Sequence, residues 1–264
     1  MSKTKNGTAF AFANHKGGSG KTTAADGFIY SLAEQGYKVL AIDTDPQMNL
    51  SYSYNFRRMP QNLHNILMDR QDNVKVESQI LKTEYPNIDI IIADTAMATI
   101  EIDLSSMFDR ARIIAKMLNK IRELNKYDFI VFDTNPSLGL MNYNVLLACD
   151  YLIIPVECSA YGVEGISHIF DYYNTVKKDN PKLKIAGVVY SKAQLNLKVT
   201  QKIMAELAED YGNLILDTII NKDEGVSQAQ YVKQPIIYFD KGRTRPARQL
   251  RAMTLEVLKR VESI

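Results

Sequence analysis

The residues best suited to chemistry lie at positions 15–23, where the chain reads His-Lys-Gly-Gly-Ser-Gly-Lys-Thr-Thr. Glycines let the backbone turn tightly and direct several N–H groups toward one point, which is how a loop cradles a phosphate. The following lysine can reach β- and γ-phosphates, and the next hydroxyl can bind Mg²⁺. The stretch therefore predicts a phosphate-binding loop built from Gly17, Gly18, Ser19, Gly20, Lys21, Thr22 and Thr23.

Two features qualify this motif. An apolar run at 8–13 precedes it and a helical pattern at 22–35 follows, which is the strand, loop and helix order that such a loop needs. The strict pattern would have its first glycine at His15, and an additional lysine, Lys16, lies inside the loop.

Carboxylates end two other apolar runs. Asp43 and Asp45 close the run at 38–43, where they can hold Mg²⁺ through water or orient an attacking water. Asp133 ends the run Phe-Ile-Val-Phe, a Walker B pattern, and is expected to hold the water shell of the metal. An aspartate at a strand end is often only a cap, but the combination with the glycine-rich loop favours function.

Composition limits the class of protein. The 264 residues suit one large α/β domain, and a net charge of +2 gives no global sign of a nucleic-acid partner. The two cysteines, Cys149 and Cys158, form no C-x-x-C pair and are interpreted as buried thiols in a reducing cytoplasm. No apolar run approaches the roughly 20 residues that cross a bilayer, and no signal peptide is visible.

Strand-like and helix-like segments alternate along most of the chain. Continuous apolar strands indicate a sheet covered on both faces, so we predict a doubly wound, mostly parallel α/β domain over 1–264. An elaboration is expected at about 52–87 and a basic segment at 241–264. The expected strands are 8–13, 38–43, 88–93, 129–133, 151–156, 185–190 and 214–220; the expected helices are 22–35, 102–125, 138–148, 163–179, 197–211 and 246–263.

These motifs together resemble the ParA/MinD superfamily of deviant Walker A ATPases, and more closely ParA partition proteins without an N-terminal DNA-binding domain. The matching stretches are 16–23, 43–47, 63–67, 133–139, 152–156 and 163–165. The chain departs from the family pattern at Ser19, Met48 and Asn135, and residues 220–223 read Ile-Asn-Lys-Asp where the family often has Ile-Pro-Arg-Asn.

The resemblance implies roles for individual residues. Lys16 would be the signature lysine that reaches the partner's nucleotide in an ATP sandwich dimer, and Asp45 would help to position the hydrolytic water. Lys21 would bind phosphate, while Thr22, Asp45 and Asp133 would serve the metal. Asn221 and Asp223 are the candidates for adenine contacts.

Basic residues late in the chain suggest a surface for DNA, because contact with phosphates needs cations but no base recognition. ParA proteins bind nonspecific DNA through such regions as ATP dimers. Arg248 and Arg251 are three apart, and Lys198 and Lys202 four apart, so each pair would share a helical face. The full set of candidates is Lys192, Lys198, Lys202, Arg243, Arg245, Arg248 and Arg251.

The implied function is a weak Mg²⁺-dependent ATPase that segregates a plasmid or chromosome. It would use ATP, form a homodimer, bind nonspecific double-stranded DNA, and be stimulated by a ParB-like centromere-binding protein in the bacterial cytoplasm at the nucleoid. The alternatives are a MinD-like membrane regulator or an ATPase that positions a protein cargo, an iron–sulfur carrier, and an adaptor that barely hydrolyses ATP. The tail 255–264 lacks Phe and Trp, so core packing is expected there rather than membrane binding.

Overall fold

The computed structural model describes residues 7–264 except residue 72, and only the backbone of residues 160–164 and 240. One eight-stranded sheet organises this part of the chain, in the order β3-β4-β2-β5-β1-β6-β7-β8. All neighbouring strands run parallel except β3, which is antiparallel to β4 at the edge. The predicted doubly wound, mostly parallel α/β fold is confirmed. The strands are β1 (Thr8–Phe12), β2 (Val39–Asp43), β3 (Leu81–Lys82), β4 (Ile88–Ile91), β5 (Phe129–Asp133), β6 (Tyr151–Glu157), β7 (Lys184–Ala193) and β8 (Ile215–Asn221).

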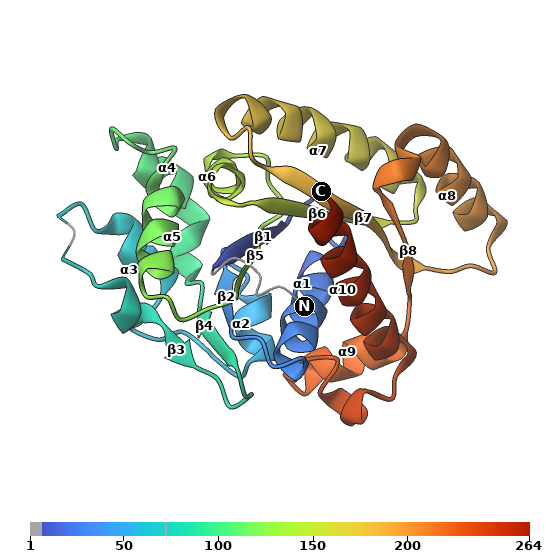
Figure 1. Ribbon diagram of the computed structural model, residues 1–264, viewed down its shortest axis with the longest axis horizontal. Coiled ribbons are helices and arrows are strands. Elements are labelled where there is room, and N and C mark those ends of the chain that lie inside the picture. The colour runs from blue at the N-terminus through green and yellow to red at the C-terminus, as the bar shows by residue number, and fades with distance from the viewer. Residues whose placement is uncertain (1–6, 72) are drawn as a thin grey trace.

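Helices cover both faces of the sheet (Figure 1). On one face, α5, α6 and α7 form a layer in which consecutive helices touch; on the other face, α1 packs against α10. The central strands β1, β2 and β5 are almost entirely buried, which explains their continuous apolar sequences. The helices are α1 (Lys21–Glu34), α2 (Asn49–Ser53), α3 (Leu63–Met68), α4 (Ile100–Ser105), α5 (Ile113–Glu123), α6 (Leu140–Ala148), α7 (Ala160–Asp179), α8 (Lys198–Tyr211), α9 (Glu224–Tyr231) and α10 (Arg245–Ser263).

The single helix expected at 102–125 is wrong, because the chain forms α4 and α5 with a break between them. The carboxamide of Asn144, on α6, explains the restart. Its oxygen accepts hydrogen bonds from the backbone N–H of Ile113 at 3.0 Å and of Ile114 at 3.5 Å, while its nitrogen donates to the Arg110 carbonyl at 2.7 Å. A side chain far along the sequence therefore caps α5 and fixes the turn before it. Helices α2, α3 and α9 and the short strand β3 also had no sequence prediction.

The last helix, α10, directs its apolar face inward. Leu250, Met253 and Val257 are completely buried, and the helix packs on β8 and α1. The expected core packing of the tail at 255–264 is confirmed at Val257 and Leu258, which are buried, whereas Leu255 and Ile264 are exposed. Among the described residues, no helix combines the length and hydrophobicity needed to cross a bilayer. Cys149 and Cys158 are free and buried, as expected.

Candidate functional site

The predicted site residues converge at the carboxyl edge of the central strands. The loop at 15–20 follows β1, Asp43 ends β2, and Asp133 ends β5, which lies between those two strands. Asp133 is in register with Asp43 on one side and with Phe12 on the other. In open α/β sheets, ligands bind beyond this edge of the strands. A cavity of about 940 Å³ opens there.

The glycine-rich loop requires its glycines for two separate reasons. Gly18 and Gly20 have φ angles of +76° and +87°, in the left-handed region that side chains rarely adopt. Gly20 is also pressed against β7, since a Cβ built on it would lie 2.1 Å from the Ser191 hydroxyl oxygen. All residues from Gly17 to Thr23 line the cavity, and α1 begins at Lys21, so the positive end of its dipole faces the same space.

Lys21 is nearly buried although it carries a charge. Its ammonium group donates a 3.2 Å hydrogen bond to the carbonyl of Lys16, which bridges the two ends of the loop. Burial lowers the pKa of Lys21, and the nearby carboxylates of Asp133 and Asp45 oppose that change. The ammonium group of Lys21 is therefore held near the carboxylates of Asp133 and Asp45, at the wall of the cavity.

The two carboxylates at the end of β2 and just beyond it have different roles. Asp43 is fully buried and accepts hydrogen bonds from the Ser51 hydroxyl at 2.6 Å, the Ser51 N–H at 2.8 Å and the Asp45 N–H at 3.1 Å. Burial raises the pKa of Asp43 to about 6. Asp45 lines the cavity and accepts one 2.9 Å hydrogen bond from the Gln47 N–H. Asp43 thus shapes the loop, and Asp45 presents its carboxylate to the ligand space.

Asp133 is completely buried, and neither of its carboxylate oxygens makes a hydrogen bond of good geometry, although the Thr22 hydroxyl and the Lys21 ammonium group lie near enough to oppose the rise of its pKa. Burial raises the pKa of Asp133 well above its usual value, and the neighbouring Asp43 carboxylate raises it further. A buried carboxylate whose hydrogen bonds are incomplete is costly unless a cation joins it. Its oxygens therefore fit a hydrated Mg²⁺, with the Thr22 hydroxyl at the start of α1 as the other predicted contact.

The additional lysine, Lys16, is directed away from its own cavity. Its ammonium group makes a 2.7 Å ion pair with Glu157 at the end of β6 and a 2.7 Å hydrogen bond to the Ser159 hydroxyl. Its backbone N–H donates to Asn14, whose side chain is anchored on the Pro155 carbonyl at 2.7 Å. In residues 16–23, Lys16 alone does not line the cavity.

The two adenine candidates line the far wall of the cavity with α9, but both are engaged within the protein. The Asn221 side chain donates to the Ala193 carbonyl at 3.2 Å and accepts from Gln249 at 2.5 Å. The Asp223 carboxylate caps α9 by accepting from the Gly225 N–H at 2.9 Å. Their contact with adenine stays a prediction.

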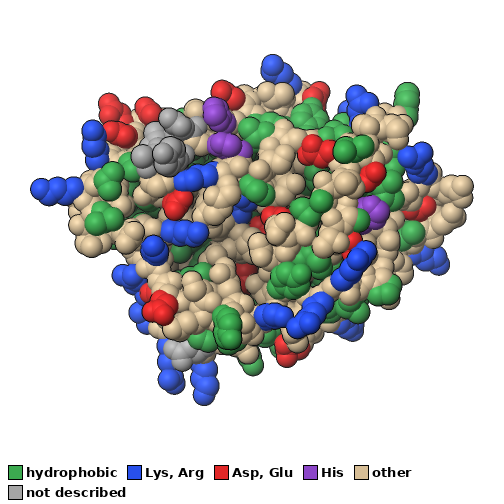
Figure 2. Space-filling model, turned by 180° about the vertical axis from the view of Figure 1, so that it is seen from behind, with side chains coloured by type: hydrophobic (Ala, Val, Ile, Leu, Met, Phe, Trp, Pro, Cys, Tyr) green, Lys and Arg blue, Asp and Glu red, His purple; other side chains and the backbone are tan. Residues whose placement is uncertain are grey.

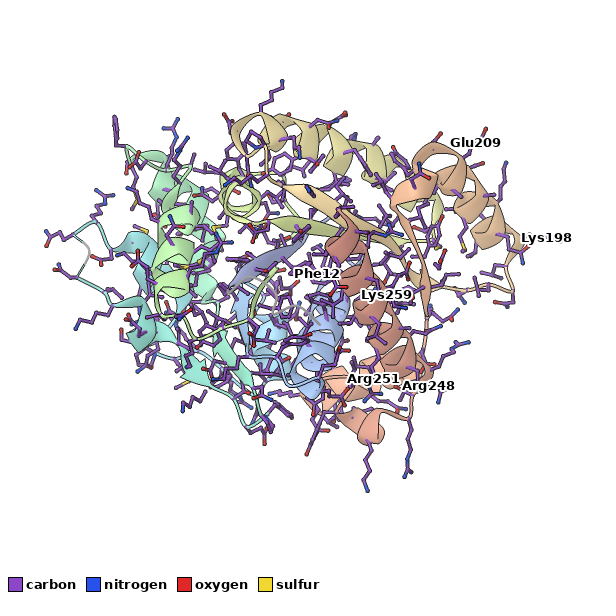
Figure 3. All side chains as sticks on the ribbon, in the orientation of Figure 1. Phe12, Lys198, Glu209, Arg248, Arg251 and Lys259 are labelled. Atoms are coloured by element: carbon purple, nitrogen blue, oxygen red, sulfur yellow. The ribbon has the colours of Figure 1, made fainter. Side chains whose placement is uncertain are left out.

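The predicted DNA-binding residues do not form one group. In Figure 3, Lys198 lies at the beginning of α8, well separated from Arg248 and Arg251 on α10. Lys198, Lys202, Arg243, Arg245 and Arg248 are exposed, whereas the Arg251 guanidinium makes two hydrogen bonds of 2.7 and 2.8 Å to the Glu34 carboxylate. On the face shown in Figure 2, basic side chains likewise stand in several separate groups. Lys192, the remaining candidate, is also exposed, but it lines the cavity at the carboxyl edge of the sheet.

Sequence reasoning missed the partners that fix the loop. Glu157 ends β6, Ser159 follows it, and Ser191 lies near the end of β7, so their positions at the ligand edge were a usable signal. The motif at 163–165, in contrast, falls on α7 where the side chains of Val163 and Glu164 lie outside the described part of the structure.

The arrangement fits a nucleotide triphosphate with Mg²⁺ on physical grounds. The glycine-rich loop and the first turn of α1 supply N–H donors, Lys21 supplies a cation, and Asp133 supplies a buried carboxylate whose hydrogen bonds are incomplete. The fold and these groups define a P-loop ATPase.

Comparison with known proteins identifies the family. The AAA domain family matches residues 7–185. The chain is 31% identical to the sporulation initiation inhibitor protein Soj of Bacillus subtilis, over 89% of this chain and 92% of that protein. It is 30% identical to the chromosome partitioning protein ParA of Caulobacter vibrioides, over 87% and 86% of the two chains. The protein belongs to the ParA/MinD family of ATPases.

Solved structures agree with this assignment. A plasmid partition protein from Borrelia burgdorferi has a TM-score of 0.73 at 25% identity, covering 96% of this chain and 99% of that chain. The cell division ATPase MinD of Pyrococcus furiosus has a TM-score of 0.77 at 22% identity, covering 96% and 99%, and so supports the fold alone.

Proposed function

We propose that this protein is a Mg²⁺-dependent ATPase that partitions DNA, with ATP-dependent dimerisation as its switch. Lys21, Thr22 and the loop N–H groups would bind the phosphates, and Asp133 would hold the water shell of Mg²⁺, which neutralises charge as the terminal phosphate leaves. Asp45, at the cavity wall, would orient the attacking water. Because the described residues that line the cavity include no strong base, hydrolysis should be slow and depend on positioning.

The orientation of Lys16 carries the dimer part of this proposal. A lysine within a phosphate-binding loop that points out of its own cavity can serve a nucleotide held by a second copy. Two nucleotides facing each other bring much negative charge together, and a cation from each protomer offsets it. Loss of the γ-phosphate would weaken this contact, so hydrolysis would dissolve the dimer.

The proposed DNA contacts are the exposed candidates that lie outside the cavity, namely Lys198, Lys202, Arg243, Arg245 and Arg248. Their exposure supports contact with phosphates, which is independent of sequence and sensitive to salt. A ParB-like partner would stimulate hydrolysis and thereby release the protein from the nucleoid. The relatives named chromosome partitioning protein and plasmid partition protein support this cargo.

Binding to nonspecific double-stranded DNA tests the proposal when measured with ATP, ADP and no nucleotide over a salt series. We expect binding that needs ATP and weakens steeply with salt. Liposomes of anionic lipid serve as the parallel surface. ATP-dependent binding to liposomes without affinity for DNA would refute DNA partition and favour a MinD-like membrane regulator, although the inward apolar face of α10 argues against that outcome.

A further inference from the structure

The end of β7 has a local distortion that redirects one lysine. Between Tyr190 and Ala193, β7 has one residue more than the paired segment of β8, from Ile219 to Asn221, so the strand bulges. Within the bulge, Lys192 has a φ angle of +53°, which is uncommon for any residue except glycine. Bulges often occur next to active sites, where they re-aim a side chain.

This distortion places the Lys192 ammonium group at the glycine-rich loop. A Cβ built on Gly18 would lie 3.8 Å from the Lys192 nitrogen, and Lys192 lines the same cavity as Lys21. The preceding residue, Ser191, packs against Gly20, so the end of β7 is fixed against the loop at two points. The residue predicted to contact DNA thus faces the space expected to hold phosphates.

The charges around Lys192 indicate an anion as its partner. No carboxylate in the described part of the chain makes an ion pair with Lys192, which lines the same cavity as Lys21. Two ammonium groups that repel each other at a loop of N–H donors are stabilised when a polyanion binds between them.

We infer that Lys192 contacts the phosphates of the nucleotide that is bound by its own protomer. Lys192 therefore does not belong to the DNA-binding surface. The inference rests on the proposed ATP binding. Lys192, near the end of β7, would act together with Lys21, which begins α1 in the same protomer.

Calorimetric titration of the Mg²⁺ complexes of ATPγS and ADP, without DNA, tests this inference. Lys192→Asn removes the ammonium group and suits the left-handed backbone, because asparagine adopts that conformation more readily. Loss of a charged contact to phosphate should weaken binding about tenfold, and Lys192→Arg should restore most of the affinity. Lys182→Gln, an exposed lysine before β7, is the matched control and should bind as the wild type does.

Unchanged nucleotide affinity of Lys192→Asn would overturn the inference, as would an equal loss in the Lys182→Gln control. Failure of the wild type to bind either nucleotide would instead refute the proposed function. At ATPγS concentrations that saturate each variant, Lys192→Asn should bind DNA like the wild type. A loss of DNA affinity with intact nucleotide binding would return Lys192 to the DNA surface and overturn the inference.

Discussion

The ion pair between Lys16 and Glu157 should restrain dimerisation, because Lys16 cannot serve a second protomer while it is held within its own. The pair has a 2.7 Å separation, and the two side chains are only 23% and 30% exposed, so it is better shielded than a typical surface pair. An ion pair of this kind contributes about 1 kcal/mol. A symmetric dimer breaks two of them, which costs about 2 kcal/mol and corresponds to roughly a 30-fold change in the dimerisation constant.

Glu157→Gln tests this restraint because it removes the charge and keeps the shape of the side chain. Sedimentation equilibrium with ATPγS and Mg²⁺ should give a dimer dissociation constant up to about 30-fold lower than that of the wild type. The Ser159 hydroxyl still accepts from Lys16 in this variant and moderates the gain. Glu209→Gln changes an exposed carboxylate on α8 and is the matched control (Figure 3). An unchanged or weaker dimer in Glu157→Gln, or the same gain in the control, would refute the reasoning.

Three further predictions concern the loop, a buried acid and the basic helix. Gly20→Ala should abolish nucleotide binding and destabilise the fold by about 1–3 kcal/mol, because its Cβ would clash with Ser191; chemical unfolding and calorimetry measure both effects. Burial raises the pKa of Asp26 to about 7, so the folded state retains a proton that the unfolded state has lost, and stability should fall as the pH rises from about 4 to 7. Asp26→Asn should therefore raise the free energy of unfolding by about 2–4 kcal/mol at pH 8 and by much less at pH 4.5. Arg251→Ala should lower the melting temperature, whereas Arg248→Ala should weaken DNA binding at unchanged stability; the opposite pattern would contradict the assignment of Arg251 to a structural ion pair.

The parts of the site that could be predicted from sequence are those encoded by neighbouring residues. The loop at 16–23 and the carboxylate of Asp133 are each read from a short stretch with a strand before it, and the fold follows from continuous apolar runs. Each predicted strand differs from the observed one by at most three residues at either end.

The parts that escaped prediction depend on contacts between distant residues. Glu157 is 141 positions from Lys16, and Glu34 is 217 positions from Arg251, so no local pattern reveals which carboxylate each cation meets. The direction of Lys192 follows from a bulge, which depends on how β7 pairs with β8. From the sequence alone, Arg251 and Lys192 were therefore both interpreted as surface charges. In the structure, Arg251 makes an ion pair with Glu34, and Lys192 faces the cavity.

The unpaired charges at the cavity link ligand binding to stability. Asp133 and Lys21 are both buried, and their mutual attraction only partly offsets the cost of removing each from water. A bound cation next to the Asp133 oxygens and a polyphosphate next to Lys21 would each supply the missing counter-charge. Because these groups are brought together only in the folded state, Mg²⁺ and ATP should stabilise the fold by mass action, in proportion to the logarithm of ligand concentration. The buried charges of Asp133 and Lys21 destabilise the unliganded fold, and for the same reason the stability of the fold should depend on bound nucleotide.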